Sequence, residues 1–331
     1  MVISALHQNI DMFKTRLLKQ SSMIKPKSLI QNSTIGIVSP SSWMNESDLK
    51  LAIAVFEEKG YHLVLGESVF LKDNTFAGTP EQRADDINGM FANPDIDAII
   101  CARGGYGANR VLPLLDYDLI QENPKIFMGY SDITAFLISI TQKTGLITFH
   151  GPMLTSFKKR MVNYNFDLME NILVGSESVT IQSPSELPAC ILKSGKAKGT
   201  LWGGNMCLLI NRLGTPDQLN TDGAILFIED IDEYLYAFDR MLVHMKKAGM
   251  FENIKGLIIG ELVDMKDYDD PFGKSTNEIV MDVCGDLDIP IISNFPCGHG
   301  IYQATLPISI PVQLDANSDS PSLTFLESPV K

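Results

Sequence analysis

The segment IFMGYSDIT, residues 126–134, joins an apolar run typical of a buried strand directly to the start of a helix. The helix continues through apolar residues to Thr144, and short apolar runs alternate with helix-period segments upstream, where Asn45 and Thr79 are placed to cap helices. This alternation is typical of a parallel sheet flanked by helices. We therefore expect strands over 34–39, 61–65, 98–102, 126–129 and 147–150.

The second half of the chain repeats the alternation after an interruption over 155–196. Strand-like runs resume at 199–204, 224–229, 254–260 and 289–293, and the tail at 306–326 has the pattern of short antiparallel strands. The 331 residues are enough for about two domains. We predict a weakly structured leader over 1–30, an N-terminal α/β domain with a Rossmann-like parallel sheet over 31–155, a connector over 156–196, and a smaller mixed α/β domain over 197–331.

The composition is that of an acidic, folded protein. Apolar residues make up 45% of the chain, and 27 Lys and Arg against 40 Asp and Glu give a net charge of −13. Without a basic stripe, such a chain is a poor ligand for nucleic acid or for an anionic membrane surface. No apolar run approaches the roughly 20 residues that span a bilayer. Charged residues interrupt the first 22 residues, where a signal peptide would need an apolar core. Five scattered cysteines without a C-x-x-C pair are typical of reduced thiols in the cytoplasm.

Ser131 stands between a strand end and a helix start, where a sharp turn would expose its hydroxyl. The backbone N–H of Asp132 would then point to the place where an oxyanion forms. Gly129 supplies a small residue two positions earlier, but Ile133 stands where a strict G-x-S-x-G elbow has glycine. The pattern fits a nucleophile and a plain helix N-cap about equally well.

A glycine-rich turn, RGGYG at 103–107, follows the predicted strand at 98–102. Glycines there let the backbone approach a ligand and turn N–H groups toward an anion. The turn lacks the Lys-Ser/Thr of a Walker A loop and the spacing of a dinucleotide fingerprint. It is either an ordinary strand-to-helix turn or half of an oxyanion hole, with Arg103 nearby for a substrate carboxylate.

Two histidines are candidates for a general base. His299 lies between glycines just beyond a strand, a position that suits an imidazole turning between partners, and His150 at another strand end is its rival. Glu229, at the end of an apolar run, is the candidate acid that orients the imidazole, with Asp230 and Asp232 as close competitors. The spacings H-x-x-E-H, H-x-H and C-x-x-C are lacking, so we expect no metal and no cofactor.

Together these motifs resemble the murein LD-carboxypeptidases of serine peptidase family S66. The matching pieces, in family order, are IGIVSPSS (35–42), RGGYG (103–107), GYSDIT (129–134), the stretch 145–152, GGN (203–205), FIED (227–230) and GHG (298–300). The resemblance extends from about residue 33 to 325. It implies an α/β N-terminal domain, a smaller mixed C-terminal domain, and an active site in the cleft between them.

The resemblance also implies residue roles. The catalytic triad would be Ser131, Glu229 and His299, acting on the amide that precedes the terminal D-Ala of a murein tetrapeptide. The N–H groups of Asp132 and Gly105 would bind the oxyanion. The expected substrate-binding residues are Arg103, Gly104, Tyr106 and Asn205. The family further implies a cytoplasmic homodimer that needs no metal.

Two alternatives to this function stay open. A second branch of the family is similar to the microcin C self-immunity hydrolases, which cleave aminoacyl-adenylate-type amides and carry a longer, aromatic-rich segment before the C-terminal domain. The tryptophans of this chain are Trp43 and Trp202, and the stretch 155–196 has none, which favours the carboxypeptidase branch. The non-enzymatic alternative is a pair of domains that closes on a small anion through the glycine loops.

Overall fold

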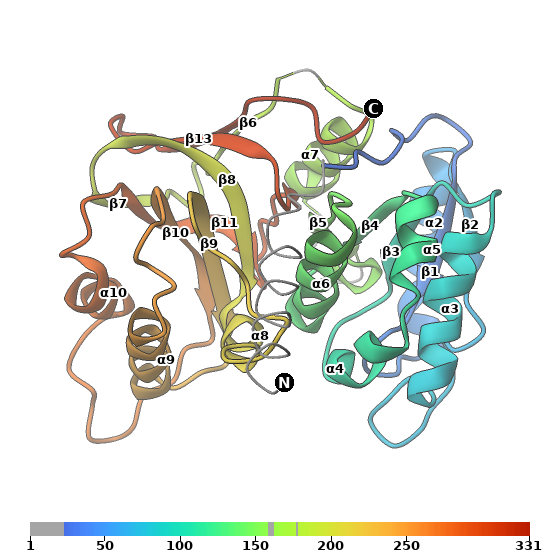
Figure 1. Cartoon of the computed structure of the whole chain (residues 1–331), viewed down its shortest axis with the longest axis horizontal. Coiled ribbons are helices and arrows are strands. Elements are labelled where there is room, and N and C mark those ends of the chain that lie inside the picture. Colours follow the sequence, from blue (N-terminus) through green and yellow to red (C-terminus); the bar gives the residue numbers. More distant parts are fainter. Residues whose placement is uncertain (1–22, 158–161, 177) are drawn as a thin grey trace, which may run out of the picture.

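Two β-sheets, one in each half of the chain, form the framework of the molecule (Figure 1). The computed structural model describes residues 23–157, 162–176 and 178–331. The first sheet has six strands in the order β12-β5-β4-β3-β1-β2, and the second has eight in the order β6-β14-β13-β8-β9-β10-β11-β7. The first is mostly parallel and the second is mixed, which confirms the predicted α/β fold class.

The N-terminal sheet follows the predicted alternation closely. Its elements are β1 (Thr34–Val38), α2 (Glu46–Glu58), β2 (His62–Leu65), α3 (Pro80–Ala92), β3 (Ala98–Cys101), α4 (Ala108–Val111), α5 (Tyr117–Glu122), β4 (Ile126–Gly129), α6 (Thr134–Thr144) and β5 (Phe149–His150). Local chemistry explains the ends of two helices. The Thr79 hydroxyl accepts from Gln82 N–H in a capping box at the start of α3, and Gly145 ends α6 in the left-handed conformation, with φ 78°. Asn45 precedes α2 without a side-chain cap hydrogen bond.

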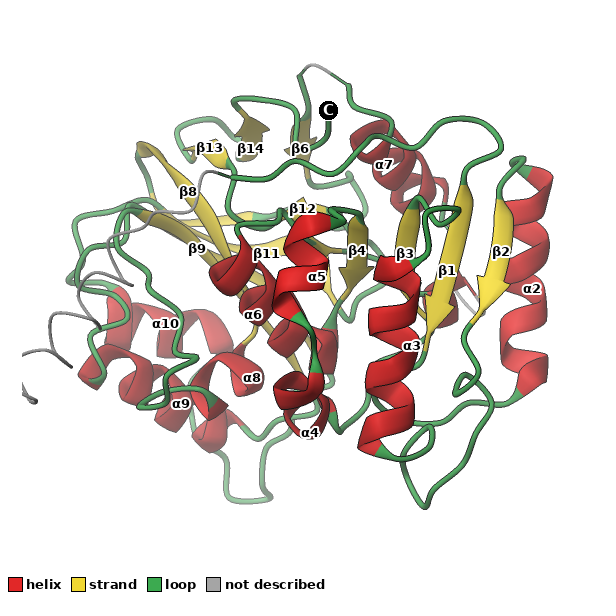
Figure 2. Cartoon of the chain, turned by 45° about the vertical axis from the view of Figure 1, so that its right-hand side comes forward, coloured by secondary structure: helices red, strands yellow, loops and turns green. Residues whose placement is uncertain are grey.

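The second half supplies all eight strands of the mixed sheet, and it also supplies β12 of the first sheet. Its elements are α7 (Asn163–Leu173), β6 (Thr180–Gln182), β7 (Cys190–Lys193), β8 (Lys196–Asn205), α8 (Met206–Asn211), β9 (Ala224–Ile231), α9 (Leu235–Lys247), β10 (Gly256–Val263), α10 (Thr276–Cys284), β11 (Ile291–Gly298), β12 (Leu306–Pro307), β13 (Pro311–Asp315) and β14 (Ser322–Phe325). Figure 2 shows α8, α9 and α10 together on one side of this sheet.

The predicted connector contains regular structure. It holds α7 and the two edge strands of the mixed sheet, β6 and β7, which pair with β14 and β11. Of the predicted leader, residues 1–22 lie outside the described residues, and residues 23–30 contain one isolated bridge and no helix or strand. Ile24 forms a bridge with Leu146, and Leu29 is buried and donates its N–H to Leu173 O. Leu29 thus belongs to the hydrophobic core, and Ile24 packs against that core.

The two halves are joined by backbone pairing as well as by side chains. Strand β12 leaves the C-terminal half and pairs antiparallel with β5, with Leu306 opposite His150. The end of the chain returns to its beginning, where Lys331 O accepts from Ser28 N–H at 2.9 Å. Figure 1 shows the red C-terminal segment crossing above α7 to reach the blue N-terminal segment.

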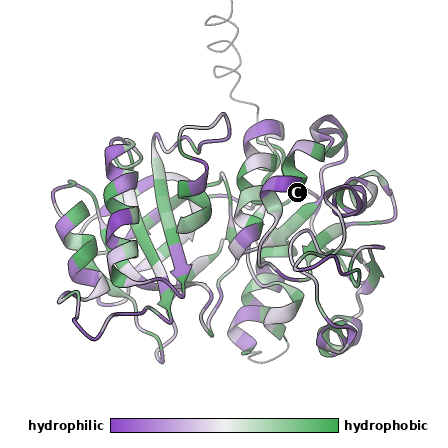
Figure 3. Ribbon diagram, turned by 90° about the horizontal axis from the view of Figure 1, so that it is seen from below, coloured by the Kyte–Doolittle hydropathy of each residue, from purple (hydrophilic) through white to green (hydrophobic). Residues whose placement is uncertain are grey.

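Apolar side chains form the hydrophobic core around both sheets. Figure 3 shows hydrophobic residues along the strands and hydrophilic residues on the outer parts of the helices. Phe56 of α2 packs edge-on against Phe157 and Phe166, and Phe127 of β4 stacks on Phe91 of α3. Helices α2 and α3 pack against the first sheet, and its inner strands β1, β3 and β4 are almost fully buried apolar runs. Among the described residues, we find no helix of the length and hydrophobicity that a membrane crossing requires.

Candidate active site

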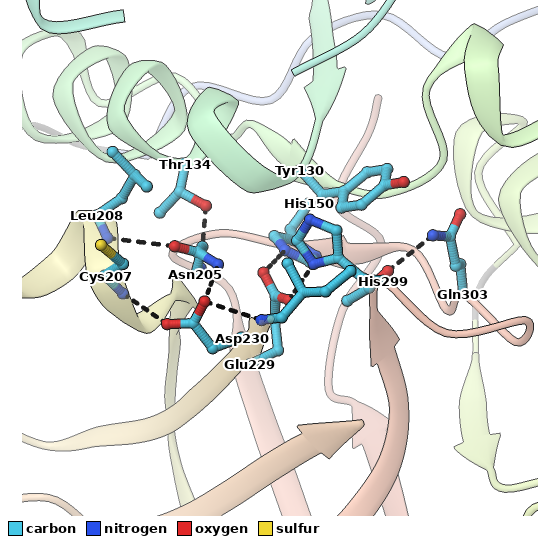
Figure 4. Close-up of polar contacts among 12 residues, drawn as sticks. Tyr130, Thr134, His150, Asn205, Cys207, Leu208, Glu229, Asp230, His299 and Gln303 are labelled. Carbon is cyan, nitrogen blue, oxygen red and sulfur yellow. Dashed lines mark hydrogen bonds and ion pairs between the residues drawn. The ribbon is translucent and has the colours of Figure 1, made fainter. Parts of the chain in front are cut away.

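Glu229 and His299 form a hydrogen-bonded pair in the C-terminal half. Glu229 lies near the end of β9, His299 directly follows β11, and β10 pairs in parallel with both strands. His299 Nδ1 is 2.8 Å from Glu229 Oε2 (Figure 4). Since a carboxylate only accepts, Nδ1 carries the proton, and Nε2 has no protein partner among the described residues. This arrangement fixes the imidazole tautomer that a general base needs.

The pair is electrostatically coupled. Burial by itself would raise the pKa of Glu229, but the charge of His299 and the neighbouring His150 imidazole outweigh burial and lower this pKa to about 2. Burial likewise lowers the pKa of His299, but the Glu229 charge and hydrogen bond outweigh it and raise this pKa above 6.5. Glu229 is therefore ionised at neutral pH, and it stabilises the protonated form of His299.

The two competing acids lie elsewhere. Asp230 accepts from Asn205 Nδ2 at 3.1 Å and from Cys207 N–H at 3.0 Å, on the side of the strand away from His299. Burial and the charge of Glu229 raise the pKa of Asp230 to about 6. Asp232 is exposed and pairs with Lys266 at 2.7 Å. Neither carboxylate contacts His299.

His150 meets the other oxygen of the Glu229 carboxylate. Its Nε2 is 3.6 Å from Glu229 Oε1, which is longer than a hydrogen bond, whereas His299 contacts Oε2. His150 is 1% exposed and His299 is 13% exposed. A base must reach its substrate, so this difference favours His299 over its rival.

Ser131 belongs to the N-terminal half of the chain and lies near the Glu229–His299 pair. It follows β4 and begins the short 3₁₀ helix Ser131–Ile133 that leads into α6, and its φ is +64°. The preceding residue, Tyr130, packs edge-on against His299, with 4.9 Å between the ring centroids. Within the described part of the chain, the Ser131 hydroxyl makes no hydrogen bond. The turn has the strained backbone of a nucleophile elbow and stands next to the imidazole.

The glycine-rich turn packs directly on Ser131. A Cβ added to Gly104 would lie 3.0 Å from Ser131 Cβ, so a larger residue there would press against the Ser131 turn. Gly105 has φ +114° and is exposed, and the next N–H, from Tyr106, donates to Ser42 Oγ at 3.2 Å. Asp132 N–H lies in the first turn of a helix, where no intrahelical acceptor exists.

Three buried side chains brace these loops, and only one of them was assigned a role from the sequence. The Asp132 carboxylate accepts from Ser41 Oγ at 2.6 Å and from Ala108 N–H at 2.9 Å. Burial raises the pKa of Asp132, although these hydrogen bonds and Arg83 oppose the shift. Arg83 is fully buried and donates to Pro40 O and Gly107 O. Ser41 lies in a matched motif, but Arg83 gave no signal because a helical arginine is usually solvated.

The expected substrate-binding residues fall into two groups. Tyr106 is 59% exposed, and Arg103 is half-buried and donates to Trp43 O at 3.1 Å, so both lie at the surface of the glycine turn. Asn205 is buried at the N-cap of α8. Its amide oxygen accepts from Leu208 N–H and its amide nitrogen donates to Asp230. These bonds fix the position of the Asn205 amide, and its contact with substrate stays a prediction.

A loop after β11 carries His299, and α7 holds it in place. Asn165, buried in α7, donates to Ile301 O at 2.9 Å and accepts from Gln303 N–H at 2.8 Å. Gln303 donates in turn to Gly298 O at 2.7 Å. Asn165 was missed because its helix lies in the predicted connector, 138 residues from Gln303.

The described residues contain no cluster of three or more His, Cys, Asp or Glu side chains that could hold a metal ion. The groups gathered here are instead a hydroxyl on a strained turn, an imidazole paired with a buried carboxylate, and N–H groups for which the described residues offer no partner. This set is suited to nucleophilic attack on a carbonyl group.

Comparison with known proteins gives two matching family models. The model of the LD-carboxypeptidase N-terminal domain matches residues 35–151, and that of the LD-carboxypeptidase C-terminal domain matches residues 198–314. A probable murein peptide carboxypeptidase of Bacillus subtilis is 34% identical over 290 residues, which are 86% of this chain and 89% of that protein.

Solved structures of two kinds are similar to the chain. The microcin C7 self-immunity protein MccF, in a mutant form bound to adenosine monophosphate, has a TM-score of 0.86 at 28% identity and covers 93% of this chain and 100% of its own. A muramoyltetrapeptide carboxypeptidase of Oxalobacter formigenes has a TM-score of 0.81 at 29% identity and covers 90% and 100%. The identities to the two kinds of protein are nearly equal.

Proposed function

The chain belongs to the LD-carboxypeptidase family, peptidase family S66, and on this premise we propose that it is a serine hydrolase that releases the terminal D-Ala of murein tetrapeptides. The observation that carries the proposal is the 2.8 Å contact between His299 Nδ1 and Glu229 Oε2, beside the strained turn of Ser131. The murein preference is supported by the Bacillus subtilis relative and by the lack of tryptophan in 155–196.

Acylation is the first half of the proposed reaction. The Ser131 hydroxyl oxygen attacks the carbonyl carbon of the amide before D-Ala, and His299 Nε2 takes the hydroxyl proton. Glu229 stabilises the imidazolium that results. The N–H groups of Asp132 and Gly105 donate to the oxyanion, and the loss of one such donor raises the barrier by about 3 kcal/mol.

Release of D-Ala and hydrolysis complete the cycle. The C–N bond breaks as His299 gives its proton to the leaving amine, which leaves an ester on Ser131. Water then attacks the ester carbonyl while His299 takes the water's proton, and this proton returns to Ser131 as the ester C–O bond breaks. We assign Arg103 to the free carboxylate of D-Ala, because an exopeptidase must recognise that charge, and we assign Gly104 and Tyr106 to the peptide beside it.

A second candidate function has its own support. The higher TM-score belongs to the MccF structure, which favours an amide of an aminoacyl adenylate as substrate. The proposed setting for either reaction is a cytoplasmic homodimer without a metal, as expected from the family resemblance and the unpaired cysteines.

One experiment separates these functions. The full chain is incubated with a defined murein tetrapeptide and, separately, with an aminoacyl-adenylate amide, and released D-Ala or amino acid is measured. We expect D-Ala release that Ser131→Ala abolishes. Hydrolysis of the adenylate amide alone would favour the MccF-like function. Binding of the tetrapeptide without turnover would instead favour the anion-binding alternative.

A further inference from the structure

His150 is a buried imidazole that the proposed reaction does not use. Its Nδ1 and Nε2 are buried and lack a hydrogen-bond partner within the described structure, and the same is true of Glu229 Oε1, which lies 3.6 Å from Nε2. Figure 4 shows His150 and His299 both directed at the Glu229 carboxylate. Burying a carboxylate oxygen without a hydrogen-bond donor costs free energy. A donor that faces Glu229 Oε1 would therefore hold the carboxylate in one orientation.

The backbone position of His150 is set by the sheet that carries the nucleophile. In the register of β4 and β5, His150 lies beside Gly129, and Gly151 N–H donates to Gly129 O. On its other side His150 pairs with Leu306 of β12. Rings of Tyr130 and Phe227 pack edge-on against it, with 6.1 and 5.1 Å between centroids. Backbone pairing therefore fixes His150 relative to the strand that leads into the Ser131 turn.

The two oxygens of Glu229 are thus faced by imidazoles from different halves of the chain. His299 follows β11 of the C-terminal sheet, whereas His150 ends β5 of the N-terminal sheet. An imidazole with its proton on Nε2 would present that N–H to Oε1. This donor opposes rotation of the carboxylate about its last bond, and so it keeps Oε2 on His299 Nδ1.

We propose that His150 is a positioning residue: it holds the Glu229 carboxylate from the nucleophile's side and thereby aligns His299 with Ser131 across the two sheets. The proposal rests on the proposed function only in taking Glu229 and His299 as the catalytic pair. His150 does not act as a base here, because its 1% exposed ring cannot reach a substrate.

Three variants of His150 test the role. Phe keeps the ring and removes the donor. The amide nitrogen of Gln reaches as far from the backbone as Nε2, whereas that of Asn reaches only as far as Nδ1. His62→Phe, at an exposed site in β2, is the control for loss of a histidine. The measurements are kcat and KM for the substrate that the wild-type protein turns over, and the low-field proton NMR resonance of a carboxylate-bound imidazole N–H, assigned to His299 by its loss in His299→Ala.

We expect His150→Phe and His150→Asn to lower kcat by about 10- to 100-fold, with KM changed less than about threefold. The low-field resonance should broaden or vanish in both, and His150→Gln should restore the resonance and most of kcat. Unchanged kcat and resonance in folded His150→Phe would overturn the proposal. If the Phe variant does not fold, the Gln and Asn variants decide, and equal impairment in both would overturn it too.

The NMR measurement separates this inference from the proposed function. If the wild-type protein hydrolyses neither substrate while the resonance responds to the variants as expected, the proposed function fails and the positioning of Glu229 by His150 stands. If D-Ala is released normally and the resonance is unchanged in all three variants, the proposed function stands and this inference fails.

Discussion

Ser131 has φ +64°, a left-handed conformation that costs a residue with a side chain about 1–2 kcal/mol. Its neighbours hold it there, since Gly104 packs on its Cβ and the Asp132 side chain bonds to two other loops. Strain of this kind persists only where the surrounding structure imposes it, and it is common where a nucleophile is exposed on a turn.

The strain of Ser131 can be measured by comparing two inactive variants. Ser131→Gly and Ser131→Ala both lose the hydroxyl and should both lose turnover. Glycine removes the left-handed penalty but has about 0.5–1 kcal/mol more entropy to lose on folding, so the Gly variant should be more stable by up to about 1.5 kcal/mol. Denaturant unfolding measures the difference. A more stable Ala variant would contradict the strained turn.

Gly298 is the last residue of β11 and directly precedes His299, and its lack of a side chain leaves room for Glu229. Its φ is +104°, and an added Cβ would lie 2.5 Å from Glu229 Oε2. Gly298→Ala should therefore displace the carboxylate and lower kcat by about 100-fold, the scale of a 1 Å misplacement. The matched control is Gly223→Ala, with φ +73° and no atom near the added Cβ. Equal kcat values for the two variants would contradict this account.

The pH dependence of kcat/KM follows from the charge of Glu229. Burial lowers the pKa of His299, but Glu229 outweighs burial and raises it above 6.5. The base must be unprotonated, so kcat/KM should rise with pH through a midpoint above 6.5. Glu229→Gln removes the raising charge, so the midpoint should move to lower pH while kcat falls by about 10³- to 10⁴-fold. An unchanged midpoint in Glu229→Gln would contradict the effect of Glu229 on the pKa of His299.

Three neighbouring strands, β9, β10 and β11, bring Glu229 and His299 together. An added Cβ at Gly260 of β10 would lie 2.9 Å from Glu229 Cβ and 2.8 Å from Cys297 O, so the strands on either side approach over a residue without a side chain. The pairing of β10 with β11 shifts register on both sides of Gly260. This irregular pairing sets the position along β10 at which β11 ends and His299 follows.

Helix α7 acts on the site through one side chain. Asn165 both donates to and accepts from the loop that follows His299, so Asn165→Ala should leave two backbone groups unpaired and lower stability by about 1–3 kcal/mol. Hydrogen exchange should accelerate at Gln303 N–H, and kcat should fall with little change in KM. Asn171→Ala, at an exposed position of the same helix, is the control. Unchanged exchange at Gln303 would remove α7 from this role.

At the scale of the whole molecule, the two sheets are parts of one structure. Strand β12 pairs with β5, Lys331 pairs with Ser28, and Asn205 N–H donates to the Thr134 hydroxyl at 3.0 Å across the two halves. The site needs this continuity, because its hydroxyl and its imidazole come from different sheets.

The continuity predicts one unfolding transition. Trp43 lies in the N-terminal half and Trp202 in β8, so Trp43→Phe and Trp202→Phe each leave one fluorescent reporter. In each variant, the denaturant transition followed by fluorescence should coincide with the transition followed by circular dichroism. Fluorescence that precedes the loss of circular dichroism in one variant would mean that the halves unfold separately.

The first sheet was predictable because strands buried on both faces must be apolar, and because the Thr79 capping box is a local signal. The family was predictable because its motifs lie in short loops at strand ends. Strands β6 and β7 were not, since they have three and four residues and pair with strands more than 95 residues away in sequence. Neither length nor pattern distinguishes such edge strands from a linker.

The α/β class, the family and the few groups able to do chemistry can be read from the amino-acid sequence. Residue patterns left His150 and His299 as rivals and Glu229, Asp230 and Asp232 as alternatives, and the family resemblance favoured His299 and Glu229. The folded chain shows that Glu229 accepts from His299, 70 residues away, while His150 faces its other oxygen. The physical reason is that a carboxylate's orientation and burial depend on the packing of strands from both sheets, which no local pattern of residues encodes.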